Sequence, residues 1–476
     1  MNNIINKSDF MLYLDAPRHL WAKKHNQYKR KEDDFSKHLS TQGYEVEKLA
    51  EKYIREYLIP KYNINPSDFL SQPTKTDEYY EARTDFLLKN SKTGKWDMYE
   101  VKSSTSVKKE HKYDATFQVL VFEKHYDLGD IYILHPNKEY IKDGEISLPE
   151  LFIAENVNEF VEELREEVML ERYNAYISAK AKHVEATIEC VKPGTCPCID
   201  LCHPNLPEYS IYNIGRLSGS KKKIRKLMED KIINVADVPE NFPLTPKQRT
   251  QVDMAQSGQT LFLNKSIQKR LDKLVYPLYF IDYETFNPAV PMHNGYKPYT
   301  HITFQYSLHI MRDENSKELE HYEYIDTSQK DPIPNLIKSL QKVIGDKGSI
   351  ISWNDTFEKG KNKEMGEIYP ECAKVCENMN ERMFDLMKIF QDQLYAVPKF
   401  KGSYSLKKVL PVLVPHLSYE GMDIEEGATA MIAWKDMVYG NLKKEKQEKI
   451  KQNLLKYCQL DTLAMVEIFN NIKEIL

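Results

Sequence analysis

The stretch Phe280–Phe286, FIDYETF, places two carboxylates two positions apart in an otherwise apolar, β-prone run. Side chains alternate between the two faces of a strand, so Asp282 and Glu284 point the same way, about 7 Å apart along the backbone. Two like charges on a half-buried face are unfavourable unless something positive lies between them. The stretch therefore predicts a strand that carries part of a cation site.

The chain after residue 276 predicts a sheet followed by helices. Apolar and aromatic runs predict strands over 278–286, 301–310, 321–326 and 348–353. The residues from about 355 onward are expected to be mainly helical. The run LLKYCQLDTLAMVEIF, near the end of the chain, is typical of a helix that carries Tyr457 and Asp461 four positions apart on one face.

A D-x-E pair on a first strand and a Y-x-x-x-D pair on a last helix resemble the DEDD exonucleases of the RNase H-like superfamily, in the subclass with tyrosine in the last motif. That family also has a middle motif resembling Asn-x-x-Phe-Asp. Here the motif starts at Asn354 and ends in Glu358, which stands where the family has Asp. Asp355 is the local alternative, but three positions away it faces elsewhere on the helix. Asp385 is a further acid, for which a helix N-terminal role is expected.

The resemblance implies a two-metal site for phosphodiester cleavage, with 3′→5′ exonucleolytic activity. Two divalent cations about 4 Å apart can hold the attacking and the leaving oxygen. Mg²⁺ or Mn²⁺ prefers carboxylate oxygens. Asp282 is expected to bridge the ions, Glu284 and Asp461 to complete their shells, and Glu358 to act through water. Tyr457 would orient or deprotonate the attacking water.

The segments 286–310 and 399–413 resemble an uncharacterised bacterial domain family in which a DEDD-like domain follows a RecB-like nuclease domain. The N-terminal half carries the residues that this resemblance implies. Strands are predicted over 79–88 and 96–104, with Asp85 on the first and with Glu100 and Lys102 on one face of the second.

This pattern resembles the RecB branch of the PD-(D/E)XK nucleases. The resemblance implies that Asp85 and Glu100 hold Mg²⁺ while Lys102 stabilises charge on the scissile phosphate or positions water. A helix over 111–126 carries Gln118, in a run that resembles the Gln-x-x-x-Tyr element of these nucleases; it would contact the DNA backbone or a catalytic water. An amphipathic helix over 38–58 offers one more metal ligand, Glu45 or Glu47, with Glu45 preferred.

Four cysteines follow a long helical stretch predicted over 150–184, and Pro and Gly between them force turns. Such a cluster is typical of a metal site; it consists of Cys190, Cys196, Cys198 and Cys202. It resembles the iron–sulfur clasp of RecB-like nucleases, whose first cysteine lies near the N-terminus in a Cys-Pro-x-x-x-Trp segment; here Ala16 takes that place. Cys198 would replace the missing cysteine and give a local four-thiolate site. The resemblance implies a [4Fe–4S] cluster there, and the alternatives are Zn²⁺ at the same site or unligated thiols. The other cysteines, Cys372, Cys376 and Cys458, are expected to be packing residues.

The segment 205–275 is expected to be a connector of short helices. Its Gly-containing turn precedes a basic run and resembles a helix-hairpin-helix element, in which amides and basic side chains hold phosphates. A solvated helix start is the alternative. The basic residues are Lys221, Lys222, Lys223, Arg225 and Lys226.

Length and composition set the remaining limits. A chain of 476 residues is too long for one core, so two or three domains are expected. The formal net charge of −4 means that a nucleic-acid binder has to use local basic patches or metal ions. No membrane-spanning run and no signal-peptide core are found, so a cytoplasmic location is expected. Seven cysteines in such a chain argue against a disulfide framework.

Together these features predict an α/β multidomain protein. Residues 1–204 are expected to form a PD-(D/E)XK restriction-endonuclease-like core with the cysteine cluster, and 276–476 an RNase H-like mixed sheet with flanking helices. The expected function is a metal-dependent DNA nuclease in repair, recombination or defence, acting on single strands or duplex ends. The alternatives are an RNA-processing exonuclease and a nucleic-acid-binding scaffold with one decayed site, which Glu358 and Ala16 favour.

Overall fold

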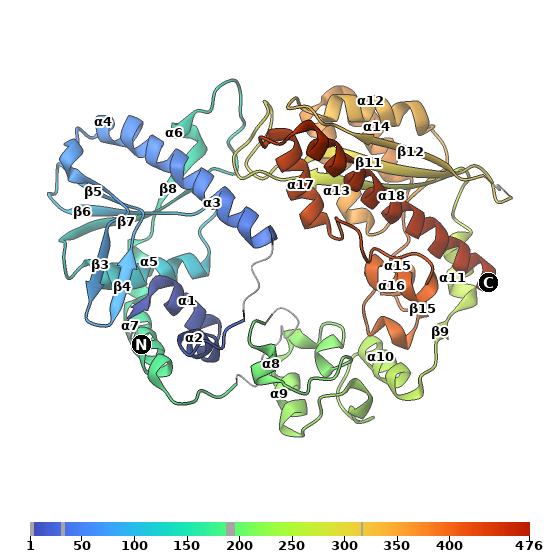
Figure 1. Ribbon diagram of the computed structural model, residues 1–476, viewed down its shortest axis with the longest axis horizontal. Coiled ribbons are helices and arrows are strands. Elements are labelled where there is room, and N and C mark those ends of the chain that lie inside the picture. The colour runs from blue at the N-terminus through green and yellow to red at the C-terminus, as the bar shows by residue number, and fades with distance from the viewer. Residues whose placement is uncertain (1–3, 30–33, 187–195, 316–317) are drawn as a thin grey trace. The chain divides into compact units, whose positions relative to one another are not determined.

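The computed structural model describes residues 4–29, 34–186, 196–315 and 318–476. The chain divides into two compact units, and the predicted mixed α/β multidomain organisation is confirmed. Unit 1 comprises Met1–Asn205 together with Pro288–Thr300, and unit 2 comprises Leu206–Asn287 together with His301–Leu476. The segment predicted as a connector therefore clusters with the C-terminal half (Figure 1).

Unit 1 contains a five-stranded sheet in the order β2-β5-β6-β7-β8 and a three-stranded sheet in the order β1-β4-β3. Among the strand pairs of its described residues, only β6–β7 and β1–β4 are parallel. The strands are β1 (Ile5–Asn6), β2 (Phe69–Ser71), β3 (Thr74–Asp77), β4 (Tyr80–Arg83), β5 (Phe86–Lys89), β6 (Trp96–Val101), β7 (Leu128–Pro136) and β8 (Phe152–Asn156). The main helices are α1 (Lys7–Asp15), α2 (Pro17–Lys24), α3 (Asp34–Tyr53), α5 (Lys109–Phe122), α6 (Leu148–Leu151), α7 (Asn158–Lys180) and α8 (Ile199–Cys202).

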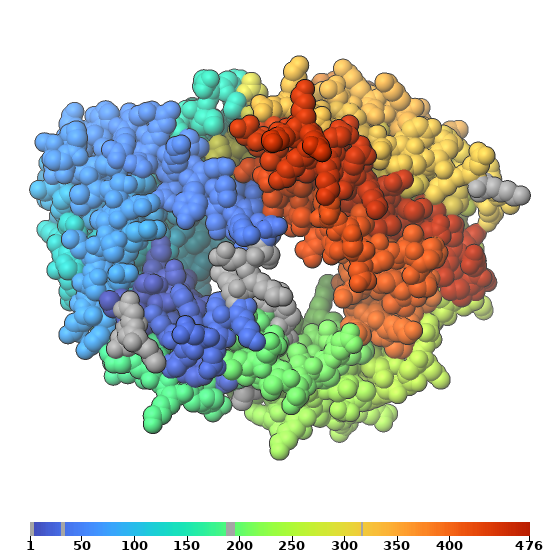
Figure 2. All heavy atoms as spheres, in the orientation of Figure 1, coloured from blue at the N-terminus to red at the C-terminus, as the bar shows by residue number. Residues whose placement is uncertain are grey.

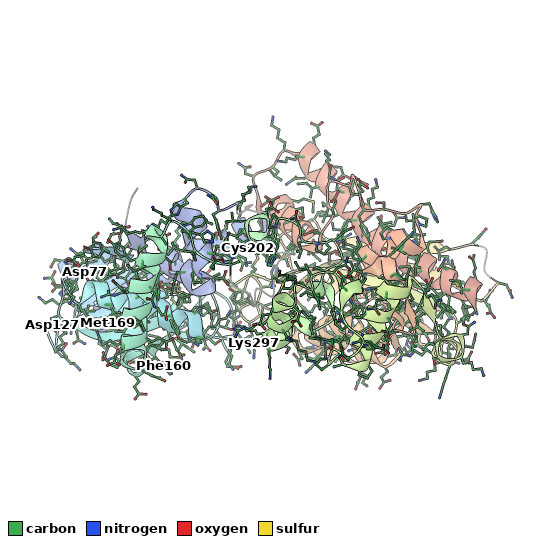
Figure 3. The ribbon with its side chains drawn as sticks, turned by 90° about the horizontal axis from the view of Figure 1, so that it is seen from below. Asp77, Asp127, Phe160, Met169, Cys202 and Lys297 are labelled. Carbon is green, nitrogen blue, oxygen red and sulfur yellow. The ribbon has the colours of Figure 1, made fainter. Side chains whose placement is uncertain are left out.

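Alternation along the strands buries both faces of the five-stranded sheet. Met98 and Leu87 pack with residues of α1, α5 and α7, whereas Tyr99 and Phe86 pack with residues of α3. Helix α3 and helix α5 accordingly lie on opposite sides of the sheet (Figure 1). Helix α7 presents the exposed side chain of Met169 to solvent (Figure 3). Glu100 lies two positions after Met98 and therefore on the same face of β6, so its side chain points towards α5.

Two predictions for unit 1 need correction. The strand expected over 79–88 is two strands, β4 and β5, which join different sheets. The break falls at Asp85, whose Oδ2 accepts a 2.7 Å hydrogen bond from the main-chain nitrogen of Val101. The helical stretch expected over 150–184 begins with strand β8, and helix α7 starts only at Asn158, because the β-branched and aromatic residues at 152–153 pair with β7.

Residues 288–300 connect two strands of unit 2 but pack within unit 1. The Gln42 side chain accepts a 3.1 Å hydrogen bond from the main-chain nitrogen of Ala289. The Tyr299 hydroxyl donates a 2.8 Å hydrogen bond to the main-chain oxygen of Ser103. The two units are therefore joined by three chain crossings rather than one.

Unit 2 contains a five-stranded mixed sheet in the order β12-β11-β10-β13-β14 and a two-stranded β9–β15 sheet. The predicted strands are found as β10 (Leu278–Phe286), β11 (Ile302–Met311), β12 (Glu320–Ile325) and β13 (Ser349–Ser352); the short strands are β9 (Leu261–Phe262), β14 (Met383–Asp385) and β15 (Tyr395–Ala396). The helices are α9 (Lys221–Glu229), α10 (Pro246–Ser257), α11 (Asn264–Leu271), α12 (Ile333–Val343), α13 (Asp355–Ile368), α14 (Ala373–Glu381), α15 (Lys388–Gln391), α16 (Leu406–Leu413), α17 (Gly427–Tyr439) and α18 (Lys444–Ile475).

The central strand β10 is antiparallel to β11 and parallel to β13. Its Phe280 side chain packs against Phe469 of α18, with ring centroids 5.8 Å apart. On the other face, the Tyr283 hydroxyl donates a 3.0 Å hydrogen bond to Asn362 of α13. The outer surfaces of α17 and α18, coloured red, are seen in Figure 2. Among the described helices, none is both long enough and apolar enough to cross a membrane.

Candidate active sites

Asp282 and Glu284 lie on the face of β10 that α18 covers, as their spacing predicts. Their carboxylate oxygens and the sulfur of Cys458 all lie within 4.8 Å of one another. The Cys458 sulfur is 3.5 Å from Oδ2 of Asp282. Cys458 was expected to be a packing residue; it is buried, but it is also a neighbour of the acids. The three side chains form a compact group of soft and hard donor atoms.

Helix α18 is held over these acids by polar contacts with the neighbouring strand. Gln305 lies opposite Glu284 in the β10–β11 register, and its amide donates a 2.8 Å hydrogen bond to the main-chain oxygen of Leu454. Ser307 lies opposite Asp282, and its hydroxyl is 2.7 Å from that of Thr462. These contacts fix the part of α18 that carries Tyr457 and Asp461.

Asp461 and Tyr457 have partners that the sequence analysis did not find. The Tyr419 hydroxyl donates a 2.5 Å hydrogen bond to Oδ1 of Asp461. The Lys407 ammonium lies 5.6 Å from the ring centroids of both Tyr419 and Tyr457. Tyr419 and Lys407 lie in a region that has no spacing motif of its own, so only the folded chain connects them with α18.

Few positively charged side chains of the described residues lie near Asp282, Glu284 and Asp461. Burial, together with the nearby charges of Asp461 and Glu284, raises the pKa of Asp282 well above its usual value. Burial and Asp461 likewise raise the pKa of Glu284. Burial raises the pKa of Asp461 to about 6, although the Tyr419 hydrogen bond and the Lys407 charge oppose the shift. A divalent cation would remove this repulsion.

Glu358 lies in the first turn of α13 and is 2% exposed. Its Oε2 atom is buried and bonds to no described residue. Burial, followed by the charges of Asp385 and Asp355, raises the pKa of Glu358 to about 8. Its charge also contributes to the raised pKa of Asp282, although Glu358 is not in the closest group of donor atoms. The structure therefore brings Glu358 to the edge of the acid cluster.

Asp355, the alternative to Glu358, is already neutralised. Its carboxylate oxygens lie 2.5 Å from the Lys359 ammonium and 3.1 Å from that of Lys388. Asp385 accepts a 3.1 Å hydrogen bond from the main-chain nitrogen of Asn354, where α13 begins. Asp385 thus bonds at the N-terminus of α13, whereas the helix that follows it in the sequence, α15, has Met387 at its N-cap and no side-chain cap.

In unit 1, the predicted residues converge on the face of the sheet that α5 covers. The Lys102 ammonium is 2.8 Å from Oε1 of Glu100 and 2.5 Å from Oδ2 of Asp114. The Lys7 ammonium also lies 2.8 Å from Oε1 of Glu100. Gln118 donates a 2.9 Å hydrogen bond from Nε2 to Oδ1 of Asp114. The site therefore contains two lysines and two buried carboxylates.

Lys7 and Asp114 were missed by the sequence analysis. Asp114 stands four positions before Gln118, a helical spacing that could have found it. Lys7 is 93 positions from Glu100, and no local pattern points to it. Two buried oxygens of this site, Oε2 of Glu100 and Oε1 of Gln118, bond to no described residue.

Asp85 and Glu100 have opposite electrostatic environments. Burial, followed by the Glu100 charge, raises the pKa of Asp85 to about 8. Burial also disfavours the charged form of Glu100, but Lys102 and Lys7 outweigh it and hold the pKa of this carboxyl well below its usual range. Burial opposes the charged form of Lys102 too, but Asp114 and Glu100 raise its pKa.

Of the two candidate acids on α3, the structure favours Glu47 rather than the preferred Glu45. The Glu47 charge is among those that raise the pKa of Asp85, and Glu47 accepts a hydrogen bond from Gln72. Glu45 is exposed and faces a surface hollow with Lys48 and Arg55. The two side chains lie about 200° apart around the helix, so only one can face the sheet.

The cysteine cluster is only partly described, because Cys190 lies outside the described residues. Cys198 is buried in a small apolar cluster with Trp21 and Ala22 of α2, and the partly buried Cys196 and Cys202 pack against that cluster. Cys202 is labelled in Figure 3.

The basic residues of the predicted connector lie at the start of α9. Lys221, Lys222 and Arg225 are exposed, and Lys223 is partly so. Lys226 forms a 2.9 Å ion pair with Asp230.

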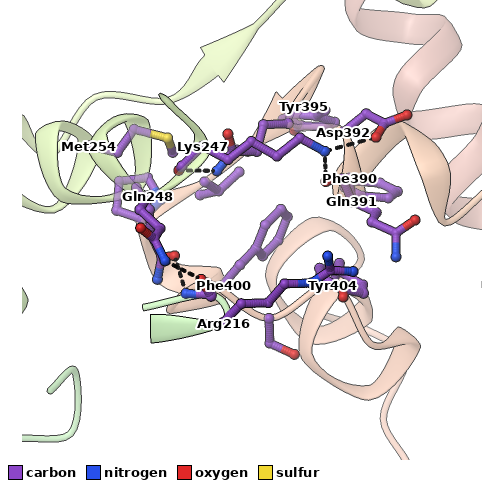
Figure 4. Close-up of a pocket in the computed structure, with 18 of the residues that line it drawn as sticks. Arg216, Lys247, Gln248, Met254, Phe390, Gln391, Asp392, Tyr395, Phe400 and Tyr404 are labelled. Atoms are coloured by element: carbon purple, nitrogen blue, oxygen red, sulfur yellow. Dashed lines mark hydrogen bonds and ion pairs between the residues drawn. The ribbon is translucent and has the colours of Figure 1, made fainter. Parts of the chain in front are cut away.

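A cavity of about 620 Å³ lies between α10 and the segment 390–404 (Figure 4). It contains none of the predicted acids. Its Lys247 and Gln248 already bond within the protein, to Asp392 and to the main chain of Gly215.

The chain is similar to a described domain family and to several proteins, none of whose names states an activity. Residues 279–405 match the family described as "Domain of unknown function (DUF2779)". The chain is similar to "Uncharacterized protein UU173" of Ureaplasma parvum, at 25% identity over 302 residues, which are 57% of this chain and 42% of that protein. It is also similar to "Uncharacterized protein MG366 homolog" of Mycoplasma pneumoniae, at 26% identity over 225 residues, which are 44% of this chain and 33% of that protein.

The chain thus spans less than half the length of these relatives. Among solved structures, "Crystal structure of SSO0001" aligns with a TM-score of 0.25 and 12% identity, covering 44% of this chain and 89% of that chain.

Proposed function

We propose that the chain is a divalent-metal-dependent nuclease with two phosphodiesterase sites and that DNA is its preferred substrate. The observation that carries the proposal is the group of Asp282, Glu284 and Asp461 on two elements far apart in the sequence. Burial raises all three pKa values, the repulsion by neighbouring acids raises those of Asp282 and Glu284 further, and the described residues around them supply little positive charge. Clusters of titratable groups with shifted pKa values are typical of functional sites.

The acids of unit 2 fit Mg²⁺ or Mn²⁺. Carboxylate oxygens are the ligands that both ions prefer, and the buried, unpartnered Oε2 of Glu358 is available for a water-mediated contact. We assign Asp282, Glu284 and Asp461 as metal ligands, in a DEDD-type, RNase H-like domain. Two such ions would stabilise the charge on the attacking and leaving oxygens. The mixed sheet with helices on both faces supports this fold assignment.

The neighbouring side chains have distinct roles in the proposal. Tyr457 is buried beside the acids and positions the attacking water through its hydroxyl. Tyr419 holds the Asp461 carboxylate in one orientation through its hydrogen bond. Lys407, near both rings, is the cation that faces a bound phosphate.

In unit 1 we propose a second site of the PD-(D/E)XK type. Asp85 and Glu100 would hold Mg²⁺ or Mn²⁺, and the unpartnered Oε2 of Glu100 fits that role. Lys102 stabilises the phosphate charge, and Gln118 contacts the DNA backbone or a water through its unpartnered Oε1. Glu47 is a further ligand candidate, in place of Glu45.

One observation favours a scaffold role for unit 1. Lys7 and Lys102 together neutralise Glu100, so this site binds a metal less readily than the acids of unit 2. A decayed site in unit 1 would leave nucleic-acid binding to the basic start of α9 and catalysis to unit 2.

The wider setting is part of the proposal. We infer that the protein acts in the cytoplasm, in DNA repair, recombination or defence against foreign DNA. We also infer that the cysteine segment binds a metal, because thiolates favour zinc and iron–sulfur clusters. An RNA-processing role is the competing function, since the proposed acids touch phosphate rather than sugar.

Matched labelled DNA and RNA strands, each single- and double-stranded, test the substrate. The purified chain is incubated with Mg²⁺ or Mn²⁺, and products are resolved by length. The proposal predicts stepwise shortening of DNA at a higher kcat/KM than of RNA. A higher kcat/KM on RNA would contradict the DNA assignment, and no cleavage of either would contradict the enzyme.

A further inference from the structure

The imidazole of His19 contacts Cys196 of the cysteine segment, although 177 positions separate the two residues in the sequence. Its Nε2 lies 3.2 Å from the sulfur of Cys196. His19 is in helix α2 and is only 8% exposed. The same residue stands three positions after Ala16, where the sequence lacks the cysteine that the family resemblance implies.

Asp15 fixes the orientation of this imidazole. Its Oδ2 is 2.7 Å from Nδ1 of His19. A carboxylate can only accept a hydrogen bond, so Nδ1 carries the proton and, in the neutral ring, Nε2 presents its lone pair to the sulfur. A carboxylate on one ring nitrogen with the other nitrogen left as a donor atom is the usual arrangement around a metal-bound histidine.

The helix that carries His19 is also bonded to the residues that follow α7 and to the cysteine segment. The guanidinium of Arg18 donates hydrogen bonds of 2.9 Å and 3.1 Å to the main-chain oxygens of Val184 and Leu201. The Trp21 indole donates a 2.9 Å hydrogen bond to the main-chain oxygen of Ala181. The His19–Cys196 contact is therefore part of a built region rather than a chance approach of two surface side chains.

The distance between Nε2 of His19 and the sulfur of Cys196 is compatible with one zinc ion bound to both atoms. Zinc bonds of about 2.3 Å to sulfur and about 2.0–2.1 Å to nitrogen, at a tetrahedral angle, place the two donor atoms about 3.6 Å apart. The observed 3.2 Å is a few tenths of an ångström shorter, so a metal has only to widen an existing contact. Imidazole and thiolate are both ligands that zinc accepts.

We propose that His19 is a ligand, through Nε2, of a single Zn²⁺ ion that it shares with Cys196 at the cysteine segment. This inference rests on the proposed metal at the cysteine segment and replaces the [4Fe–4S] cluster with a mixed His/Cys site. It gives His19 the place of the absent cysteine at Ala16. Asp15 is a positioning residue, because it acts only through His19.

Metal content and affinity test the assignment on the full chain, purified anaerobically. Zinc and iron per chain are measured by mass spectrometry, and zinc affinity by competition with a chromogenic chelator. The wild type should carry about one zinc per chain, and His19→Ala should weaken zinc binding by more than 100-fold, since the loss of an outer partner alone costs about 10–100-fold. Asp15→Asn should weaken it about 10-fold. His19→Cys should restore binding, because a thiolate is also a zinc ligand.

His25→Ala is the matched control. His25 lies one turn after Trp21, and its Nδ1 bonds the main-chain oxygen of Trp21 at 2.9 Å rather than a sulfur, so zinc binding should not change. Cobalt substitution gives a second readout, because replacing a nitrogen ligand by sulfur in His19→Cys should intensify the thiolate-to-cobalt absorption.

The possible results distinguish a failure of the metal site at the cysteine segment from a failure of His19 as its ligand. A wild type without zinc or iron would overturn both the proposed metal and the role of His19. Zinc that His19→Ala retains at wild-type affinity while Cys196→Ala loses it would overturn His19 alone. Iron with an absorbance near 400 nm would overturn the zinc site.

Discussion

The ammonium of Lys7 lies 2.8 Å from Oε1 of Glu100, the acid that the sequence predicts as a metal ligand in the N-terminal half. The Lys102 ammonium also lies 2.8 Å from the same oxygen. One carboxylate oxygen thus meets two cations, while Oε2 of the same group bonds to no described residue. The site is charge-balanced without a metal, and its dependence on Lys7 can be measured.

Lys7→Met should lower the unfolding free energy by about 1–3 kcal/mol in the absence of divalent ions, because it leaves buried carboxylates with one lysine fewer. Mg²⁺ should reduce this deficit, since it supplies the missing charge at Glu100. Lys23→Met is the control: Lys23 pairs with the buried Asp9 outside the site, at 2.7 Å, and its deficit should not respond to Mg²⁺. Denaturant unfolding with and without Mg²⁺ measures both, and an equal Mg²⁺ effect on the two variants would argue against metal binding at Glu100.

Glu358→Gln should lower kcat/KM for DNA by about 10–100-fold, the usual cost of losing an outer-shell partner. Glu358→Asp should retain activity, because the shorter acid keeps a carboxyl group that can hold a metal-bound water. Asp355→Asn is the matched control in the same helical turn; its carboxylate is bound to Lys359 and Lys388, so it should affect stability but not the rate. The assay is run with Lys102→Ala present to silence unit 1. A larger loss of rate in Asp355→Asn than in Glu358→Gln would reverse the assignment.

Tyr419→Phe should move the acid limb of the pH–rate profile to higher pH. The Tyr419 hydrogen bond favours the ionised form of Asp461, so its removal raises the pKa of that carboxyl above its present value of about 6. The carboxylate that the metal needs is then lost at a higher pH. Tyr439→Phe removes a buried hydroxyl of unit 2 that bonds to no described residue, and its profile should coincide with that of the wild type. Coincident profiles for all three proteins would show that Asp461 does not limit the rate.

His309 should make the unfolding free energy fall in mild acid. Burial lowers the pKa of His309 from 6.5 to about 3, with a smaller contribution from His321. The unfolded chain binds a proton between these values while the folded chain does not, so this group's stabilisation is complete above the unfolded pKa and is lost as pH falls. The slope is about 1.4 kcal/mol per pH unit in that interval. His309→Gln should flatten it, and His416→Gln, at an exposed position, should not. An unchanged slope in His309→Gln would contradict this account.

The strands of unit 2 could be predicted because buried runs such as 278–286 leave little choice of secondary structure. The pairing of Asp282 and Glu284 on one face followed from strand periodicity alone. Lys7, Lys407 and Tyr419 could not be predicted in the same way, because each reaches its site through tertiary packing and none lies in a spaced motif. The break at Asp85 was missed for a related reason: its side chain replaces a ladder hydrogen bond, and only the pairing with Val101 reveals this.

The central claim is that the chain cleaves DNA at two metal sites, one per unit. The direct measurement compares cleavage of labelled single- and double-stranded DNA by the wild type, Asp282→Ala, Lys102→Ala and the double variant, at fixed Mg²⁺ or Mn²⁺. Circular dichroism confirms that each variant is folded. The account predicts that each single variant loses part of the activity and the double variant loses all of it. Cleavage that remains at the wild-type rate in the double variant would contradict it.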